Sequence, residues 1–254
     1  MNFLNHHHKP LPEIIPKIIP EIIYYEEIDS TNSEAWRLLD RRQAEVGDAI
    51  VAKRQSQGRG QRGHHWQSDV GGLFMSVILQ PQIAAIDAHQ ITLWTAWAVA
   101  KALRETGADV SIKWLNDLVI DRRKLGGILT ETKIESGWID YAVVGIGINW
   151  TNTVPDGAIA LSELPTTLSS LDELIEIVRS GIALGQQRYT KEGIIGILAE
   201  YCEMLHSRQV LTNIAGQEQC GNIIDIRPTG ELVVRWEKSS TDALYQPHTF
   251  SVGY

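Results

Sequence analysis

The chain has 254 residues, of which 43% are hydrophobic and 21% charged, and its formal net charge at pH 7 is −8. This length and composition are typical of a soluble globular protein with one medium domain and a small additional unit. Proteins that bind duplex DNA or RNA usually carry a basic surplus to neutralise phosphates, so the acidic charge argues against nucleic acid as a partner. No apolar run approaches the roughly 20 residues of a membrane span, and we expect no membrane partner.

The N-terminal residues 1–23 contain four prolines spaced among isoleucine pairs. Proline at this density prevents a continuous helix, so we expect a flexible tail that is too short for a helix-turn-helix domain. The chain has two cysteines, Cys202 and Cys220, without metal-ligand spacing, and we found no signal-peptide pattern. We interpret them as separate thiols in a reducing compartment and expect a cytoplasmic protein.

Residues 24–206 alternate between strand and helix patterns and are expected to form the main domain. A helix is predicted to start at residues 29–32, with Ser30 or Thr31 as its N-cap, because hydroxyl side chains cap helix N-termini. The further predicted elements are strands at 49–52 and 73–79, a helix at 89–106, strands at 110–114, 118–120 and 141–149, and a helical region from 169 to about 206. After residue 206 the pattern changes to short strands and turns, including 249–252, which predicts a small five-stranded barrel over residues 207–254.

The first run of residues that could take part in binding or catalysis is Gly58-Arg59-Gly60-Gln61-Arg62-Gly63, flanked by Gln55 and Trp66. Three glycines in six positions let backbone N–H groups approach a ligand, and the arginines add forked donors for carboxylate or phosphate oxygens. Trp66 could stack on a purine. The run lacks the Gly-Lys-Ser/Thr ending of a P-loop. Composition alone leaves a solvated flexible loop as an equal alternative.

The second run is Lys113-Trp114-Leu115-Asn116-Asp117, at the end of a predicted strand. Burying an ammonium group without a partner is costly, so a lysine among apolar neighbours is a candidate for binding a carboxylate or an α-phosphate. Asp117 could hold Mg²⁺ or a lysine, and Lys124 follows on the far arm of the same hairpin. The alternative is an ordinary surface ion pair between Lys113 and Asp117.

The third run is Gly145-Ile146-Gly147-Ile148-Asn149. Alternating glycines in a strand leave one face without side chains, which makes room for a ligand or a closely packed element.

In combination these runs resemble biotin–protein ligases. The matching motifs are Asp-Ser-Thr-Asn at 29–32, Gln-x-x-Gly-Arg-Gly-x-x-Gly-x-x-Trp-x-Ser at 55–68, Lys-Trp-x-Asn-Asp at 113–117, Lys-x-x-Gly-Ile-Leu at 124–129 and Gly-Ile-Gly-Ile-Asn at 145–149. The resemblance implies an α+β fold related to the class II synthetases. It has a mixed, mostly antiparallel sheet with helices packed on one face, followed by a C-terminal barrel of the SH3 type.

The resemblance also implies roles for individual residues. The biotin-binding set would be Ser30, Thr31, Asn32, Gln55, Arg59, Gly60, Gln61 and Lys113. The nucleotide-binding set would be Arg62, His64, Trp66, Asn116 and Asn149. The catalytic set would be Arg59, Lys113, Asp117 and Lys124, with Asp117 as the candidate ligand for Mg²⁺.

The implied activity uses biotin, ATP and Mg²⁺ to make biotinyl-5′-AMP. The biotin is then transferred to a lysine of a biotin carboxyl carrier protein, the partner expected from a carboxylase such as acetyl-CoA carboxylase. The oligomeric state is left open, with a homodimer as one option. Two alternatives stay open as well: a lipoate or octanoate ligase of related fold, and a non-catalytic biotin-binding regulator.

The sequence departs from the family pattern at three positions. Gln61 and His64 stand where a basic residue is usual, and Leu115 replaces a proline. Fewer positive charges near the adenylate predict that biotinyl-AMP is retained less firmly than is typical of the family.

Overall fold

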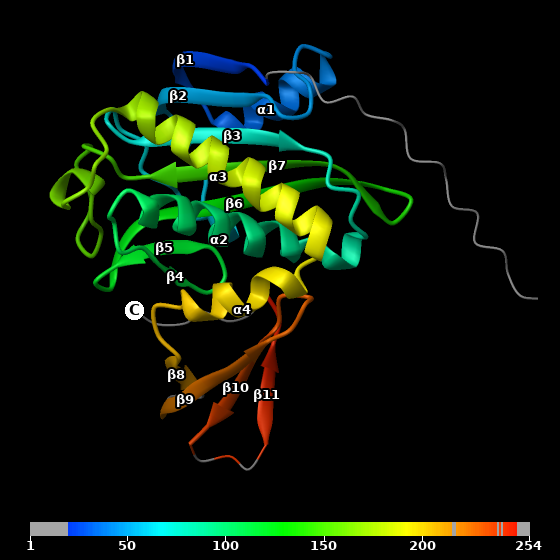
Figure 1. The fold of residues 1–254 in the computed structure, drawn as a ribbon, viewed down its shortest axis with the longest axis vertical. Coiled ribbons are helices and arrows are strands. Elements are labelled where there is room, and N and C mark those ends of the chain that lie inside the picture. The colour runs from blue at the N-terminus through cyan, green and yellow to red at the C-terminus, as the bar shows by residue number, and fades with distance from the viewer. Residues whose placement is uncertain (1–19, 215–216, 238, 240, 248–254) are drawn as a thin grey trace, which may run out of the picture.

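The structure is a computed structural model that describes residues 20–214, 217–237, 239 and 241–247. A large sheet with helices packed on it occupies most of the molecule, and a smaller sheet lies at one end (Figure 1). The strands of the large sheet are β1 (Ile22–Ile28), β2 (Ala49–Gln55), β3 (Leu73–Leu79), β4 (Ser111–Lys113), β5 (Asp117–Ile120), β6 (Arg123–Glu135) and β7 (Trp138–Ile148). The helices are α1 (Thr31–Asp40), α2 (His89–Glu105), α3 (Leu171–Glu192) and α4 (Ile195–Glu203).

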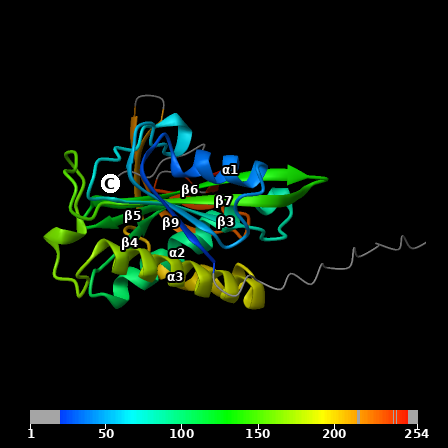
Figure 2. The same ribbon diagram turned by 90° about the horizontal axis from the view of Figure 1, so that it is seen from above.

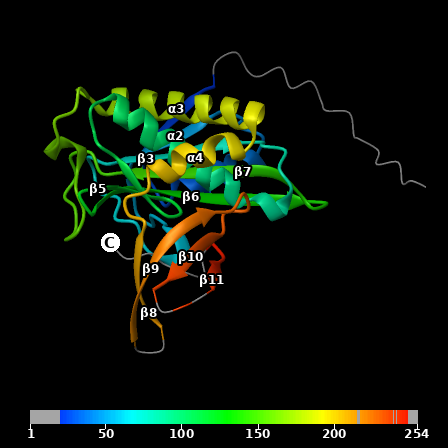
Figure 3. The same ribbon diagram turned by 60° about the horizontal axis from the view of Figure 1, so that its bottom comes forward.

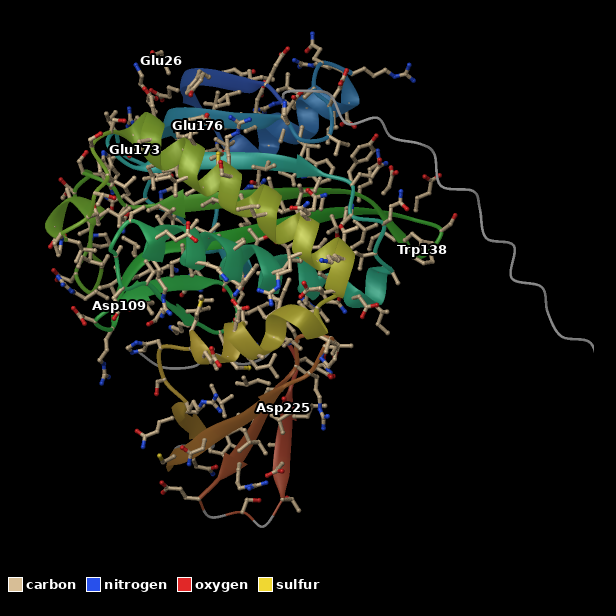
Figure 4. The ribbon with its side chains drawn as sticks, in the orientation of Figure 1. Glu26, Asp109, Trp138, Glu173, Glu176 and Asp225 are labelled. Carbon is tan, nitrogen blue, oxygen red and sulfur yellow. The ribbon has the colours of Figure 1, made fainter. Side chains whose placement is uncertain are left out.

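The large sheet has seven strands in the order β1-β2-β3-β7-β6-β5-β4. β1 pairs with β2 in parallel, and every other neighbouring pair is antiparallel. This confirms the predicted mixed, mostly antiparallel sheet. The longest pairing joins β6 to β7, and their hairpin extends to Trp138 at the edge of the molecule (Figure 4).

The helices cover both faces of this sheet, so the expectation of helices on one face was wrong. α1 packs through Ala35 and Leu38 on a cluster that includes Ile50. α2 and α3 pack on the opposite face, in a cluster that includes Val51. Figure 2 shows α1 on one side of the sheet and α2 and α3 on the other. The reason lies in the strands: adjacent residues such as Ile50 and Val51 point to opposite faces, and both are apolar.

The predicted helical region at 169–206 divides into two helices. α3 ends at Glu192 and is capped by Gly193, whose positive φ of 65° is a conformation that glycine adopts without strain, and α4 follows. The predicted start is confirmed, since Ser170 Oγ accepts a hydrogen bond from the Glu173 N–H at 3.1 Å. The Glu173 carboxylate in turn accepts from the Ser169 N–H at 2.8 Å. Figure 4 marks Glu173 in this first turn.

The predicted tail is wrong at its last two residues, because Ile22 and Ile23 form the start of β1. Residues 1–19 lie outside the described part of the chain. Cys202 and Cys220 are free thiols, as expected. No helix within the described ranges has the length and apolar character needed to cross a membrane.

The smaller sheet contains β8 (Gln209–Ile214), β9 (Gln217–Ile226), β10 (Leu232–Trp236) and β11 (Asp242–Tyr245). It is antiparallel in the order β11-β10-β9-β8 and lies next to α4 (Figure 3). A separate β unit follows α4, in agreement with the predicted small β domain. The predicted strand at 249–252 lies outside the described residues, and the domain boundary near residue 206 stays a prediction.

Candidate active site

A cavity of about 250 Å³ lies between the glycine-rich segment that follows β2 and the strands β5, β6 and β7. Residues from each of the predicted runs line this cavity. They are Ser30, Thr31, Asn32, Gln55, Arg59, Gly60, Gln61, Arg62, His64, Trp66, Lys113, Asn116, Asp117 and Lys124. The structure therefore brings together all the predicted site residues except Asn149.

The glycine-rich segment forms a short hairpin over the cavity. Arg59 bridges to His65, and the Gly60 N–H donates to the His64 carbonyl at 2.7 Å. At the tip, Arg62 adopts a positive φ of 57°. The ends of the hairpin are also joined, since the Gln55 N–H donates to the Ser68 carbonyl. The segment thus has regular backbone hydrogen bonds, and most of its residues, including Arg59 and residues 62–65, are exposed to solvent.

One end of the cavity is built on the N-terminus of α1. Ser30 is the N-cap residue, yet its side chain makes no capping hydrogen bond, and Ser30 lines the cavity. Gln55 Oε1 accepts from the Thr31 N–H at 2.8 Å and lies 3.2 Å from Thr31 Oγ1. Ser76 Oγ, which is fully buried, lies 2.6 Å from Asn32 Oδ1 and 2.7 Å from Thr31 Oγ1. These hydrogen bonds fix the polar side chains in one arrangement before any ligand arrives.

The two strand glycines make room for packed side chains. A Cβ atom added to Gly145 would lie 2.3 Å from Asn32 Oδ1. A Cβ atom added to Gly147 would lie 2.6 Å from Cε2 of the Trp66 ring. The prediction that this strand face accommodates a closely packed element is therefore confirmed, and both packed elements line the cavity.

Three basic side chains gather where β4 and β5 meet the hairpin. Lys124 Nζ forms an ion pair with Asp117 Oδ1 at 2.7 Å and lies 5.3 Å from the centre of the Trp66 ring. Burial lowers the pKa of Lys113, Asp117 opposes that effect, and Lys124 and Arg62 lower the pKa further. Such a concentration of positive charge beside a partly buried lysine favours an anionic ligand.

The two asparagines of the predicted nucleotide-binding set donate their amide N–H groups to backbone carbonyls. Asn116 Nδ2 donates to the Ile128 carbonyl at 2.8 Å. Asn149 is buried, and its Nδ2 donates to the carbonyls of Ile159 and Lys124. Asn149 is thus placed behind the cavity wall, where it supports the backbone of Lys124.

Residues 24–149 match the biotin/lipoate A/B protein ligase family. The chain is 37% identical over 150 residues to the bifunctional ligase/repressor BirA of Bacillus subtilis (strain 168). Residues 24–149 belong to the biotin/lipoate A/B protein ligase family. A second relative is the biotin–[acetyl-CoA-carboxylase] ligase of Paracoccus denitrificans, which is 32% identical over 140 residues.

The match to the Bacillus protein covers 58% of this chain and 46% of that protein. The match to the Paracoccus protein covers 54% of this chain and 58% of that protein. The chain thus spans about half the length of the curated relatives it matches. Among solved structures, the biotin protein ligase from Aquifex aeolicus in complex with biotin and ATP has a TM-score of 0.70. That likeness, at 25% identity, covers 90% of this chain and all of the other.

Sequence reasoning missed two residues that organise the cavity, Ser76 and Glu131. Ser76 lies within a buried apolar strand, where one hydroxyl gave no signal of its own. Glu131 could have been found: Gly127 and Leu129 line the cavity, and the two-residue period of β6 places Glu131 on the same face. Its carboxylate contacts Arg59 and Asn32.

Proposed function

We propose that this protein is a biotin–protein ligase that activates biotin with ATP and transfers it to a lysine of a biotin carboxyl carrier protein. One observation carries the proposal: a single cavity is lined both by the Ser30–Asn32 end and by the cluster of Lys113, Asp117 and Lys124. Biotin has a neutral polar ring and a carboxylate tail. An enzyme that joins this tail to a nucleotide needs one end of the site for the ring and another for the anionic groups. The kinship of residues 24–149 supports the same activity.

The Ser30–Asn32 end suits the ureido ring of biotin, which offers one carbonyl acceptor and two N–H donors. Hydroxyl, amide and backbone groups supply both donors and acceptors there. Because Gln55 and Ser76 already hold Thr31 and Asn32, binding the ring costs little further ordering. Lys113 then lies on the side of the carboxylate tail.

In the first half-reaction the biotin carboxylate oxygen attacks the α-phosphorus of ATP, and the bond to pyrophosphate breaks. Two anions must approach each other, so Lys113, Lys124 and Arg62 offset their repulsion and the charge that develops on the phosphate oxygens. Trp66 offers a ring face for the adenine. The hairpin of residues 55–68 limits the access of water to the reactive mixed anhydride.

In the second half-reaction a deprotonated lysine of the carrier attacks the biotinyl carbonyl carbon. An amide bond forms, the bond to the phosphate oxygen breaks, and AMP leaves with the electron pair while the amine proton goes to solvent. Lys113 and Arg62, which both line the cavity, would stabilise the phosphate of the leaving AMP.

Mg²⁺ fits this site through a single protein carboxylate. Asp117 lies at the cavity and uses Oδ1 for Lys124, and the described residues contain no cluster of three or more acidic, histidine or cysteine side chains. Mg²⁺ is commonly held by one or two carboxylates together with substrate phosphates, and it supplies charge neutralisation on the phosphate oxygens.

The decisive test of activation is biotin-dependent exchange of labelled pyrophosphate into ATP, with lipoate and octanoate as control acids. Exchange with biotin alone is expected. Exchange with lipoate or octanoate in its place would indicate a lipoate-type ligase, and no exchange with any acid by folded protein would favour a binding role.

Transfer needs a separate test. The enzyme is incubated with biotin, ATP, Mg²⁺ and a biotin carboxyl carrier domain, and the mass of the carrier is measured. One added biotin is expected, and substitution of the acceptor lysine by arginine should abolish it. Activation without any modification of the carrier would refute the proposed partner.

A further inference from the structure

Glu131, on β6, accepts hydrogen bonds from three side chains beside the cavity and has no part in the mechanism above. Its Oε1 lies 3.0 Å from Arg59 Nη1. Its Oε2 accepts from Arg59 Nη2 at 3.1 Å, from Asn32 Nδ2 at 3.0 Å and from Trp36 Nε1 at 3.2 Å. Both carboxylate oxygens are thus engaged, with three of the four contacts at Oε2, so Glu131 connects three side chains at one point.

The pair of Glu131 and Arg59 has the side-by-side geometry that fixes direction as well as charge. Two N–H groups of one guanidinium meet the two oxygens of one carboxylate, which orients both planes. Exposed ion pairs contribute little stability. Here the side chain of Glu131 is only 28% exposed, against 43% for Arg59. The pair ties the glycine-rich hairpin to β6 across the cavity edge, because Arg59 belongs to that hairpin.

The contact with Asn32 determines which way its amide faces. Asn32 Nδ2 donates to Glu131, and Asn32 Oδ1 lies 2.6 Å from Ser76 Oγ. The absence of a side chain at Gly145 leaves room for Oδ1, since a Cβ there would lie 2.3 Å away. A flipped amide would place an NH₂ group against this wall and an oxygen against the Glu131 carboxylate, so only one orientation satisfies all the partners.

We propose that Glu131 is a positioning residue for biotin binding, a role that rests on the proposed function of this site. It holds the Arg59 guanidinium at the cavity edge and fixes the amide of Asn32, so that biotin meets these groups already in place. A guanidinium has five N–H donors and the pair with Glu131 uses two, so Arg59 keeps the capacity to bind a ligand while it is held.

The test compares Glu131→Gln with Glu135→Gln, a matched control on the same strand whose side chain is exposed. Glutamine keeps the size of Glu131, but it loses the charge and turns one acceptor into a donor that faces Arg59 and Asn32. Hydrogen bonds to charged groups are strong enough that we expect the KM for biotin to rise about tenfold in pyrophosphate exchange. The kcat and the KM for ATP should stay near those of the control.

A double-mutant comparison shows whether Glu131 acts through Arg59. If it does, Glu131→Gln added to Arg59→Ala should raise the KM for biotin much less than it does in the wild-type background. If Glu131→Gln raises the KM for biotin by the same factor in the Arg59→Ala background as in the wild type, the proposal is overturned. A KM for Glu131→Gln equal to that of Glu135→Gln, in protein whose melting temperature shows it to be folded, would also overturn it.

A measurement without catalysis separates this proposal from the proposed function. In hydrogen–deuterium exchange of the ligand-free protein, residues 55–66 should exchange faster in Glu131→Gln than in Glu135→Gln, and Glu131→Asp, which keeps the charge, should lie between them. Equal exchange in all three variants would refute the positioning role. Absence of biotin-dependent pyrophosphate exchange in the wild-type enzyme would refute the proposed function. It would leave the hydrogen–deuterium result for Glu131 standing.

Discussion

Gly147→Ala is the substitution whose effect follows most directly from the geometry. The added Cβ would lie 2.6 Å from Cε2, 2.7 Å from Nε1 and 3.0 Å from Cζ2 of Trp66. Carbon atoms in ordinary contact are about 3.5–4.0 Å apart, so one partner must move by about 1 Å. Gly147 is paired with Phe74 on β3 and Gly127 on β6, so the strand is held on both sides and the indole ring moves.

Such overpacking is expected to destabilise the fold by about 1–3 kcal/mol. A displacement of about 1 Å in a group that positions substrate can reduce turnover by roughly 10²-fold. Since Trp66 is assigned to the nucleotide, we expect kcat/KM for ATP to fall by about 10–100-fold, with a much smaller change in the KM for biotin.

The assay is pyrophosphate exchange with ATP and biotin varied in turn, together with thermal unfolding. Ile148→Val is the control, because it removes a buried methyl group in the same strand and should cost about 0.5–1.5 kcal/mol without touching Trp66. Trp66→Phe, which has a smaller ring, should destabilise the Gly147→Ala background less than it does the wild type. An unchanged kcat/KM for ATP in folded Gly147→Ala would refute both the clash and the nucleotide role of Trp66.

Three further predictions concern the charged groups. Lys113→Ala and Arg59→Ala should each lower the rate of adenylation by about 10²–10³-fold or more, and near-normal turnover of both would contradict the site assignment. Gln61→Arg should slow dissociation of biotinyl-AMP by about tenfold in a filter-binding chase, because it adds a charge-assisted donor, whereas equal rates would contradict weak retention. Burial lowers the pKa of Lys113, so its charge is lost at lower pH than that of an ordinary lysine. The affinity for biotin should therefore fall on the alkaline side below pH 10.5, the ordinary lysine value, and Lys113→Arg should shift that fall to higher pH.

The fold could be predicted where local pattern determines it. The buried strand at 73–79 and the helix starting at 89 both follow from apolar periodicity, and the structure has β3 at Leu73–Leu79 and α2 at His89–Glu105. The sheet order could not be predicted that way, because pairing depends on contacts between distant segments. Cover on both faces could have been predicted from β2, whose apolar residues point to both faces, but which helices provide it depends on contacts between distant segments.

The site was predictable to the extent that a residue's chemistry stands out from its surroundings. Arg59 and Lys113 were identifiable because cations beside glycines or within apolar runs need a reason to be there. The glycines at 145 and 147 were predicted to create space, although their occupants, Asn32 and Trp66, were not. Glu131 was overlooked because an acidic residue in a strand is usually a solvated side chain, although the two-residue period of β6 places it on the face of Gly127 and Leu129.

The polar residues at this site divide by what their side chains are bonded to. The amide of Asn149 donates to the backbone carbonyls of Lys124 and Ile159, and Gln55 Oε1 accepts from the Thr31 N–H. Substitution of these residues would therefore also move the neighbouring groups that they hold. Lys113 and Lys124 instead bring charge to the cavity itself. Loss of an amide should therefore be partly relieved by a side chain that restores the same backbone hydrogen bond, whereas loss of a lysine should be relieved only by another cation.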